Sequence, residues 1–314
     1  GSTSLKFREK MSRLAFGETA YYDAVISNYF NKFNNINFPK RKILYTNLIE
    51  NLRYGENPHQ IGAFYSQNMK NKLEQLHGKT LSYNNYSDIF AALTISKSLP
   101  KKTGTAIVKH GNPCGVSALK NNFDSYKSAL ESDPISAFGG IISCNYKITQ
   151  KLALILNKIY LEVIVADGFE KKALKILKSK KNLRLIDSSK ITFNEIWKFN
   201  SVDNFTLIQS EDRKIFSKKD FRIVSKKKPN KSQLDNLMFA FNVCRYAKSN
   251  AIVLASNKST VGIGSGQPSR LDSCEIAINK MNKFSKIKNE IVAASDAFFP
   301  FVDGVEKLVQ SGVS

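Results

Sequence analysis

Apolar and polar positions alternate along the chain in patterns that predict helices and strands in turn. Apolar residues recur at mostly helical spacing over residues 5–33, which predicts a helical lead-in. The polar stretch 34–39 ends in proline and predicts a boundary after that helix. A further helical pattern covers 87–99, with Ser87 or Asp88 as its expected N-cap.

The same order of elements occurs twice. The apolar run 105–108 predicts a short buried strand that leads into a loop, and 141–143 predicts another strand. Later, a helix-like stretch over 232–248 precedes an apolar strand over 250–254 and a glycine-rich loop. We therefore expect two related α/β halves, with the polar, lysine-rich segment 200–231 as the junction between them.

Length and composition are those of a folded globular protein. The chain has 314 residues, of which 42% are hydrophobic and 24% charged. No run approaches the roughly 18 apolar residues that a membrane span needs, and no charged-then-apolar leader opens the chain, so we expect neither membrane insertion nor secretion. Its four cysteines are far apart, which favours a reducing compartment and a cytoplasmic location.

The formal net charge of +22 raises the question of a nucleic-acid partner. The positive residues are mostly lysines spread along the chain, and the denser groups fall in segments predicted to be solvated helix faces or turns. We expect affinity for small anions and no nucleic-acid partner, with a basic nucleic-acid-binding module as the alternative.

The chain offers three imidazoles, those of His59, His77 and His110. His110 follows Lys109 directly after the predicted strand 105–108, where α/β sheets usually build their sites. A neighbouring ammonium favours a neutral imidazole, as a general base must be, and it also stabilises a developing oxyanion. This pair suits acyl or formyl transfer to an amine, whereas a structural or solvated histidine is the competing interpretation.

Two polar loops are further candidates for ligand binding. Arg53 and Tyr54, with Asn57 and His59 nearby, suit a phosphate or carboxylate, although the loop equally suits a helix cap. The turn 133–140 ends in paired glycines that permit close backbone approach to a ligand, but a structural turn needs them too.

Other motifs fail on their details. The run 262–267 lacks the spacing of a dinucleotide-binding loop and the acidic residue that follows one, so we expect no such site. Pro113 and Cys114 match only part of a zinc motif, because no second cysteine follows two residues later. The aromatic run 298–301 either joins the core or offers a stacking surface to a flat ring.

Together these blocks resemble the AICAR formyltransferase family, the transformylase portion of bifunctional purine-biosynthesis proteins. The match runs in order from about residue 5 to the end of the chain, in the segments 52–60, 81–85, 108–115, 133–140, 248–251, 262–270 and 294–301.

The resemblance implies formyl transfer from 10-formyltetrahydrofolate to the 5-amino group of AICAR, giving FAICAR. It also implies two cytidine-deaminase-like α/β/α units in tandem without zinc, a homodimer with its sites at the interface, and a potassium ion such as some members bind. The expected divisions are a lead-in over 1–38, a first unit over 39–200 and a second over 201–314. A deaminase-fold enzyme with other chemistry is the alternative.

Ten positions match the family's functional residues. The resemblance makes His110 the proton acceptor from the amine and Lys109 the transition-state stabiliser, while Asn250 orients the reacting groups. The implied AICAR contacts are Arg53, Tyr54, Gly139 and Glu162, and the implied folate contacts are Arg270, Phe298 and Asp303.

The chain departs from the family at three places. Asp167 and Gly168 stand where members usually have proline after Ala166. Members continue well beyond the aromatic run, so the second unit is expected to be incomplete and the activity impaired. Residues 4–30 resemble the last helix of the family's IMP cyclohydrolase domain, so no cyclohydrolase activity is expected of this chain.

Overall fold

The computed structural model describes residues 2–69, 73–193, 197–287 and 289–314. It divides into two compact units, 1–70 and 71–314.

The first unit holds a long helix and a hairpin. Helix α1 (Leu5–Phe33) confirms the predicted lead-in, and the Ser4 side chain caps it by accepting the N–H of Phe7. Strands β1 (Asn47–Leu52) and β2 (Gly62–Ser66) pair antiparallel. They enclose the loop 53–60 that the sequence marked as a candidate binding loop.

The second unit is built on one mixed sheet. Its described strands follow the spatial order β13-β11-β12-β5-β4-β6-β7-β8-β3. The pairs β6–β7 and β7–β8 are parallel, and the other neighbours are antiparallel. The strands are β3 (Glu74–His77), β4 (Thr105–Lys109), β5 (Asn112–Ser117), β6 (Ile141–Cys144), β7 (Val163–Ala166), β8 (Arg184–Asp187), β11 (Ile252–Ser256), β12 (Ser259–Gly264) and β13 (Val292–Ser295).

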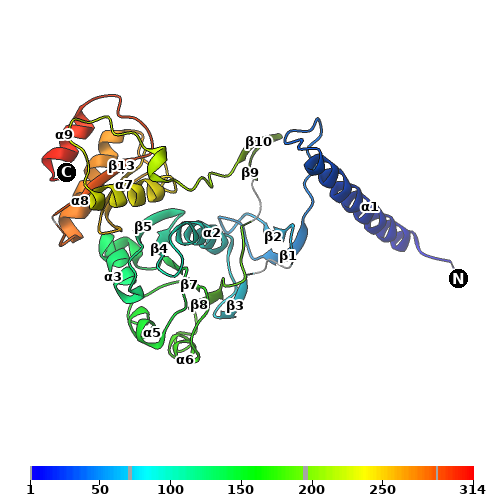
Figure 1. Cartoon of the computed structure of the whole chain (residues 1–314). Helices are drawn as coiled ribbons and strands as arrows, with labels where there is room; N and C mark the ends of the chain where they lie inside the picture. Colours follow the sequence, from blue (N-terminus) through cyan, green and yellow to red (C-terminus); the bar gives the residue numbers. More distant parts are fainter. Residues whose placement is uncertain (1, 70–72, 194–196, 288) are drawn as a thin grey trace. The chain divides into compact units, whose positions relative to one another are not determined.

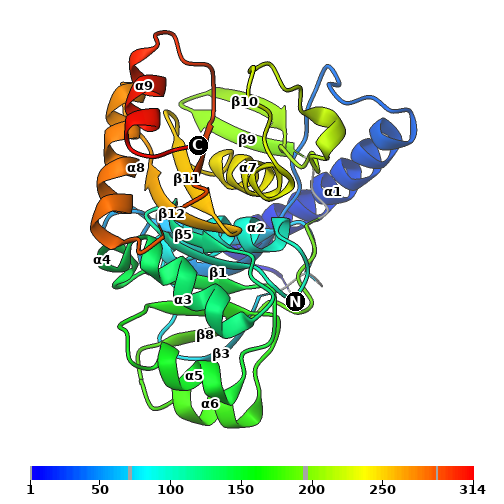
Figure 2. The ribbon, with the colours of Figure 1, turned by 60° about the vertical axis from the view of Figure 1, so that its left-hand side comes forward.

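Helices cover both faces of this sheet. Alternate residues of β4 point to opposite faces: Val108 packs with α2 and α7, whereas Ile107 packs with α3, α5 and α6. In β11, Val253 faces α7, and Leu254 faces α8. Helices α5 and α6 lie side by side, as do α8 and α9 (Figures 1 and 2). The helices are α2 (Tyr83–Ser98), α3 (Asn122–Ser132), α4 (Pro134–Ala137), α5 (Gln150–Leu156), α6 (Lys171–Leu177), α7 (Lys231–Cys244), α8 (Arg270–Phe284) and α9 (Asp303–Gln310).

This arrangement confirms the α/β class. Apart from the short helix α4 between α3 and β6, the order α2-β4-β5-α3-β6 returns as α7-β11-β12-α8-β13. Both β4 and β11 lie between the next two strands of their own half. The order agrees with two related halves. The deaminase-like character of these units and the boundaries at residues 38 and 200 stay predictions.

Glycines in β5 and β12 let these central strands approach their helices closely. A Cβ on Gly115 would lie 1.8 Å from the Ala129 carbonyl oxygen of α3. One on Gly264 would lie 1.9 Å from the Ser273 carbonyl oxygen of α8. The glycine-rich run 262–267 is therefore only partly a loop, because Gly262 and Gly264 belong to β12 and serve helix packing.

Two other element assignments need correction. Helix α2 begins at Tyr83 rather than after Ser87 or Asp88, because Ser82 and Asn85 form a capping box that starts the helix earlier. The expected junction 200–231 is partly regular: β9 (Trp197–Val202) and β10 (Phe205–Ser210) form a hairpin, and a 3₁₀ turn, η1, covers Lys218–Asp220.

The two halves meet where β5 lies beside β12, and side-chain hydroxyls make much of this joint. Ser117 and Ser259 are the paired ladder residues, and their Oγ atoms lie 2.8 Å apart. The buried Thr260 Oγ1 accepts the N–H of Val116 at 2.9 Å. Because a buried N–H without a partner is costly, this hydroxyl replaces a missing ladder bond.

We expect Thr260→Val to lower the free energy of unfolding by about 1–3 kcal/mol, because it keeps the side-chain shape and leaves the Val116 N–H unpaired. Urea denaturation measures the change. Thr103→Val is the control, since its hydroxyl bonds the Pro100 carbonyl at an exposed position. Equal stability of the two variants would contradict a role of the Thr260 hydroxyl at the joint.

Candidate functional site

The Lys109–His110 pair lies in a tight hairpin turn. Lys109 pairs with Asn112 across β4 and β5, which leaves His110 and Gly111 as a two-residue turn. Their φ angles are 51° and 72°, as a type I′ turn requires. The expected loop is therefore shorter than the sequence suggested, since β5 already begins at Asn112. The His110 side chain is exposed at the tip of this turn.

A carboxylate from α2 binds the backbone of the turn. Asp88 Oδ1 accepts the N–H of Gly111 at 2.6 Å, and Asp88 Oδ2 accepts that of His110 at 3.2 Å. Asp88, considered from sequence as a helix cap, is half-buried inside α2 and serves the turn instead.

Lys109 reaches the neighbouring loop before β6. Its Nζ donates to the Phe138 carbonyl oxygen at 2.8 Å. The next residue, Gly139, has a φ of 72° and donates its N–H to the Tyr160 carbonyl oxygen at 2.9 Å. The structure thus brings Lys109 and Gly139 together, as two of the expected site residues.

Glu162 lies at the same edge of the sheet, directly before β7. Its N–H donates to the Gly140 carbonyl oxygen at 3.2 Å, next to Gly139. Asn85 Nδ2 donates to Glu162 Oε2 at 2.9 Å, and an Arg184 guanidinium nitrogen lies 3.8 Å from the same oxygen. The carboxylate is half exposed and is held in place by these two neighbours.

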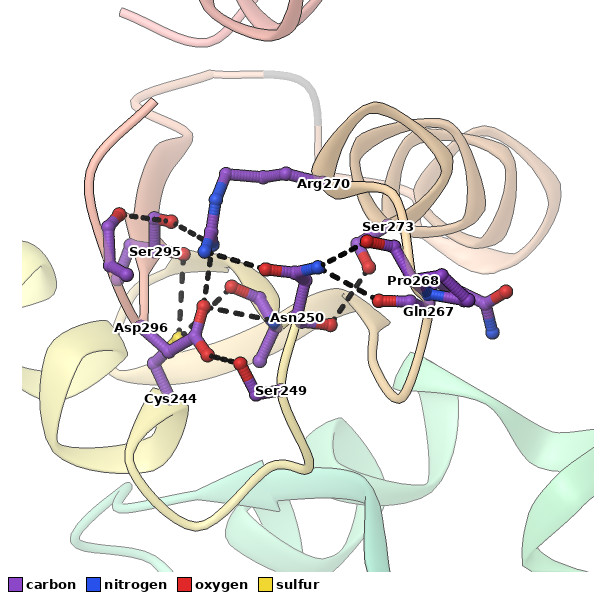
Figure 3. A network of polar contacts seen from close by, with 12 residues as sticks. Cys244, Ser249, Asn250, Gln267, Pro268, Arg270, Ser273, Ser295 and Asp296 are labelled. Carbon is purple, nitrogen blue, oxygen red and sulfur yellow. Dashed lines mark hydrogen bonds and ion pairs between the residues drawn. The ribbon is translucent and has the colours of Figure 1, made fainter. Parts of the chain in front are cut away.

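In the second half, Asn250 is held shortly before β11 (Figure 3). Its Nδ2 donates to the carbonyl oxygens of Gln267 and Pro268 at 2.9 and 2.8 Å. Its Oδ1 accepts from a guanidinium nitrogen of Arg270 at 2.7 Å. The Asn250 side chain is thereby fixed from three sides.

Arg270 bridges Asn250 and the end of β13. Its other terminal nitrogen donates to Ser295 Oγ at 2.7 Å and to Asp296 Oδ1 at 2.5 Å. In Figure 3 the side chain reaches from the start of α8 toward these three partners. The guanidinium, expected to contact folate, therefore also orders the Asn250 side chain.

Asp296 is the anion of this network. Besides Arg270, it accepts from the Ser249 hydroxyl and from the Ala251 N–H. Burial alone would raise the pKa of the Asp296 carboxyl. The hydrogen bonds from Arg270 and Ser249 outweigh burial and hold that pKa below the usual 3.8, so the carboxylate is ionised at neutral pH.

One asparagine links the two clusters. Asn112, at the start of β5, donates through Nδ2 to the His110 carbonyl oxygen at 3.2 Å. Its Oδ1 accepts the N–H of Lys248 at 3.1 Å, two residues before Asn250. The turn that carries His110 and the segment that carries Asn250 are therefore neighbours at one edge of the sheet.

Four further site residues were expected from the sequence, Arg53, Tyr54, Phe298 and Asp303. Arg53 and Tyr54 belong to the first unit, where the Arg53 guanidinium lies 5.8 Å from the Tyr54 ring centroid. Phe298 is 81% exposed, so the interpretation of the aromatic run as core is wrong at this position. Asp303 is exposed and opens α9.

Sequence reasoning missed the supporting residues Asp88, Asn85 and Asp296. Asn85 and Asp88 are three apart on α2, a spacing that places both on one helical face, and this was the available signal. Asp296 bonds residues far away in the sequence, which no local pattern indicates.

The cysteines and the acidic side chains do not gather into a cluster of metal ligands in the described parts of the chain. There, no group of three or more His, Cys, Asp or Glu side chains could hold a metal ion. The four cysteines are free and buried, and burial, with the nearby Asp133 carboxylate, raises the pKa of the Cys114 thiol to about 12. No helix in the described ranges is long and apolar enough to cross a membrane.

Comparison with known families decides the membership of the chain. Residues 1–280 match the family described as the AICARFT/IMPCHase bienzyme. The chain belongs to this family.

Similar curated proteins of the AICARFT/IMPCHase family are longer than the chain. The "Bifunctional purine biosynthesis protein PurH" of Thermoanaerobacter sp. (strain X514) is 42% identical over 318 residues, which cover all of the chain and 62% of that protein. The protein of the same name from Aquifex aeolicus is 39% identical, with coverage of 100% and 62%. That of Leptospira biflexa is 42% identical, with coverage of 95% and 58%. The chain thus spans less than two thirds of the length of these relatives.

The Arg270–Asp296 pair predicts an acid-sensitive stability. The pKa of Asp296 in the folded protein is below its ordinary value of 3.8. Its carboxylate therefore contributes fully to the stability of the fold above pH 3.8, and this contribution is lost as the pH falls through the folded-state pKa. We expect Asp296→Asn to lower the free energy of unfolding by on the order of 2 kcal/mol at pH 7, where Arg270 loses a charged partner. The difference from the unsubstituted protein should shrink below pH 3.8, and urea denaturation across pH measures it.

Asp203→Asn is the matched control, since Asp203 is exposed in the β9–β10 turn and asparagine tolerates its positive φ. A pH-independent loss in Asp296→Asn would show that the ionised carboxylate is not what stabilises the network.

Proposed function

We propose that this protein transfers a formyl group from 10-formyltetrahydrofolate to the 5-amino group of AICAR, giving FAICAR and tetrahydrofolate. The observation that carries the proposal is the turn at the end of β4. It presents the exposed side chain of His110 directly after Lys109 in the sequence, and the Lys109 ammonium donates to the Phe138 carbonyl next to Gly139. Membership of the AICARFT/IMPCHase family supports the choice of reaction.

The proposed step pairs a base with an oxyanion stabiliser. The AICAR amine attacks the formyl carbon, whose C=O electron pair moves onto oxygen. His110 accepts the amine proton and becomes an imidazolium. The oxyanion then re-forms the C=O bond, the bond from carbon to the folate nitrogen breaks, and that nitrogen takes the proton from the His110 imidazolium. An ammonium has three donors, and the Phe138 carbonyl takes one of those of Lys109, so donors remain for the oxyanion.

The other matched residues would hold the two substrates. We assign AICAR contacts to Arg53, Tyr54, Gly139 and Glu162, because these positions match the family's motifs. Asn250 orients the reacting groups, supported by the three hydrogen bonds that fix its side chain.

The folate contacts are assigned to Arg270, Phe298 and Asp303. The exposed Phe298 ring offers a surface on which a flat heteroaromatic ring can stack. The Arg270 guanidinium and the exposed Asp303 carboxylate supply polar groups at the same half of the sheet.

We further propose a homodimer of tandem deaminase-like units in the cytoplasm. The free, buried cysteines support a reducing compartment, and the repeated element order supports the tandem units. Potassium binding stays a prediction of the resemblance, and no step of the reaction is assigned to a metal.

His110→Ala tests the proposal. We expect the formyl-transfer rate to fall by about 10²–10⁴-fold, the usual contribution of a general base. AICAR binding, measured by isothermal titration, should persist because His110 acts on the proton. Retention of transfer in this variant would contradict the proposed role.

His77→Ala is the matched control. That imidazole bonds the Lys180 carbonyl oxygen at 3.2 Å from β3, at the edge strand of the sheet. Its loss should leave the transfer rate unchanged.

A further inference from the structure

We infer that Asp88 is a positioning residue for His110, which it places by binding the backbone amides of the turn. The inference rests on the proposed function, and nothing in the resemblance assigns a role to Asp88. Among the described residues, the Asp88 carboxylate is the only side-chain acceptor of both amides. The Gly111 N–H donates to Asp88 Oδ1 at 2.6 Å, and the His110 N–H donates to Asp88 Oδ2 at 3.2 Å.

The turn needs such an acceptor. In a two-residue hairpin the amides of both central residues are not part of the strand ladder, and here Lys109 and Asn112 form the last ladder pair. His110 also adopts a positive φ, which is costly for a residue with a Cβ. Because its two oxygens accept both amides of the turn, Asp88 favours this conformation over the alternatives open to an exposed turn.

Asp88 itself is held on a rigid support. Helix α2 is fixed at its start by the Ser82–Asn85 capping box. The next residue, Ile89, is fully buried in the core. The Asp88 carboxylate is therefore fixed relative to the sheet, and it transmits that position to the turn.

Helix capping does not explain this carboxylate. Ser82 occupies the N-cap of α2, and Asp88 lies beyond the first turn, where the helix dipole falls off. Both carboxylate oxygens are directed to the hairpin, not to free amides of α2. The arrangement thus serves the turn that carries His110.

The effect of Asp88 on the turn extends to Asn112 and Lys248. The His110 carbonyl accepts from Asn112 Nδ2, and Asn112 Oδ1 accepts the N–H of Lys248. A turn released from Asp88 would disturb both contacts. The imidazole would then lose its place relative to Lys109 and to the segment before Asn250.

The test compares Asp88→Ala with Asp88→Asn by two measurements. Hydrogen–deuterium exchange, resolved over residues 109–112, reports the two turn amides. Steady-state kinetics with AICAR and 10-formyltetrahydrofolate report kcat and KM separately. Asp88→Asn keeps one acceptor oxygen and puts an NH₂ group toward the other amide, so it should lie between Asp88→Ala and the unsubstituted protein.

In Asp88→Ala we expect exchange at the turn to become at least about tenfold faster and kcat to fall by roughly 10- to 100-fold, as misplaced catalytic groups do. KM for AICAR should change less than about threefold, because Asp88 positions a catalytic group and does not bind substrate. Where Asp88→Ala fails to fold, as circular dichroism shows, the same measurements on Asp88→Asn decide.

Asp187→Ala is the control. That carboxylate also accepts a loop amide, the N–H of Ser189 at 2.8 Å, after β8. Its loss should change neither kcat nor exchange over 109–112.

Unchanged exchange at the turn in Asp88→Ala would overturn the inference. Faster exchange with an unaltered kcat, or a rise in KM as large as the fall in kcat, would also overturn the positioning role. Absence of formyl transfer in the unsubstituted protein counts against the proposed function instead, and the exchange result still decides whether Asp88 holds the turn.

Discussion

The antiparallel contact between β5 and β12 is the joint on which the second unit depends. The paired residues of this contact are Ser117 and Ser259. The Thr260 hydroxyl accepts the Val116 N–H, and the two serine hydroxyls bond each other, so side chains supply hydrogen bonds that a continuous backbone ladder would otherwise make. On either side of this joint, the strands are close to their helices because Gly115 and Gly264 have no Cβ. A short, well-fitted contact thus makes one sheet from two hairpins.

This joint also explains where the candidate site lies. With β5 and β12 adjacent, the turn before β5 and the segment before β11 reach the same edge of the sheet. Asn112 and Lys248 are in hydrogen-bonding contact there, although 136 positions separate them in the sequence. Each half then adds a support from a helix: Asp88, beyond the first turn of α2, binds the hairpin turn, and Arg270, at the start of α8, binds Asn250.

Hydrophobic periodicity predicted the elements whose formation depends on residues near in the sequence. The long helix over 5–33 and the strand over 105–108 follow from periodicity and apolar content, and both occur. The start of α2 is set by the Ser82 cap, and Gly262 belongs to β12 because that strand packs closely against α8. Hydrophobic periodicity carries no information on either.

The candidate site shows the same division. Lys109 and His110 were found from their place after a strand, and Asn250 from the resemblance. Asp88 supports the turn that carries His110, and Asp296 supports Arg270, which bonds Asn250. Both act through contacts between residues far apart in the sequence, which only the folded chain creates.

An exposed general base poses a physical problem that this fold solves through the backbone. The imidazole of the proposed base must be open to substrate, so its ring cannot be fixed by packing, and the His110 side chain is indeed exposed. What can be fixed is the peptide on either side. Strand β4 holds Lys109 in the sheet, and the carboxylate of Asp88 holds the next two amides. Anchoring the main chain limits the positions of the ring while its reacting edge stays free, which is the preorganisation that proton transfer needs.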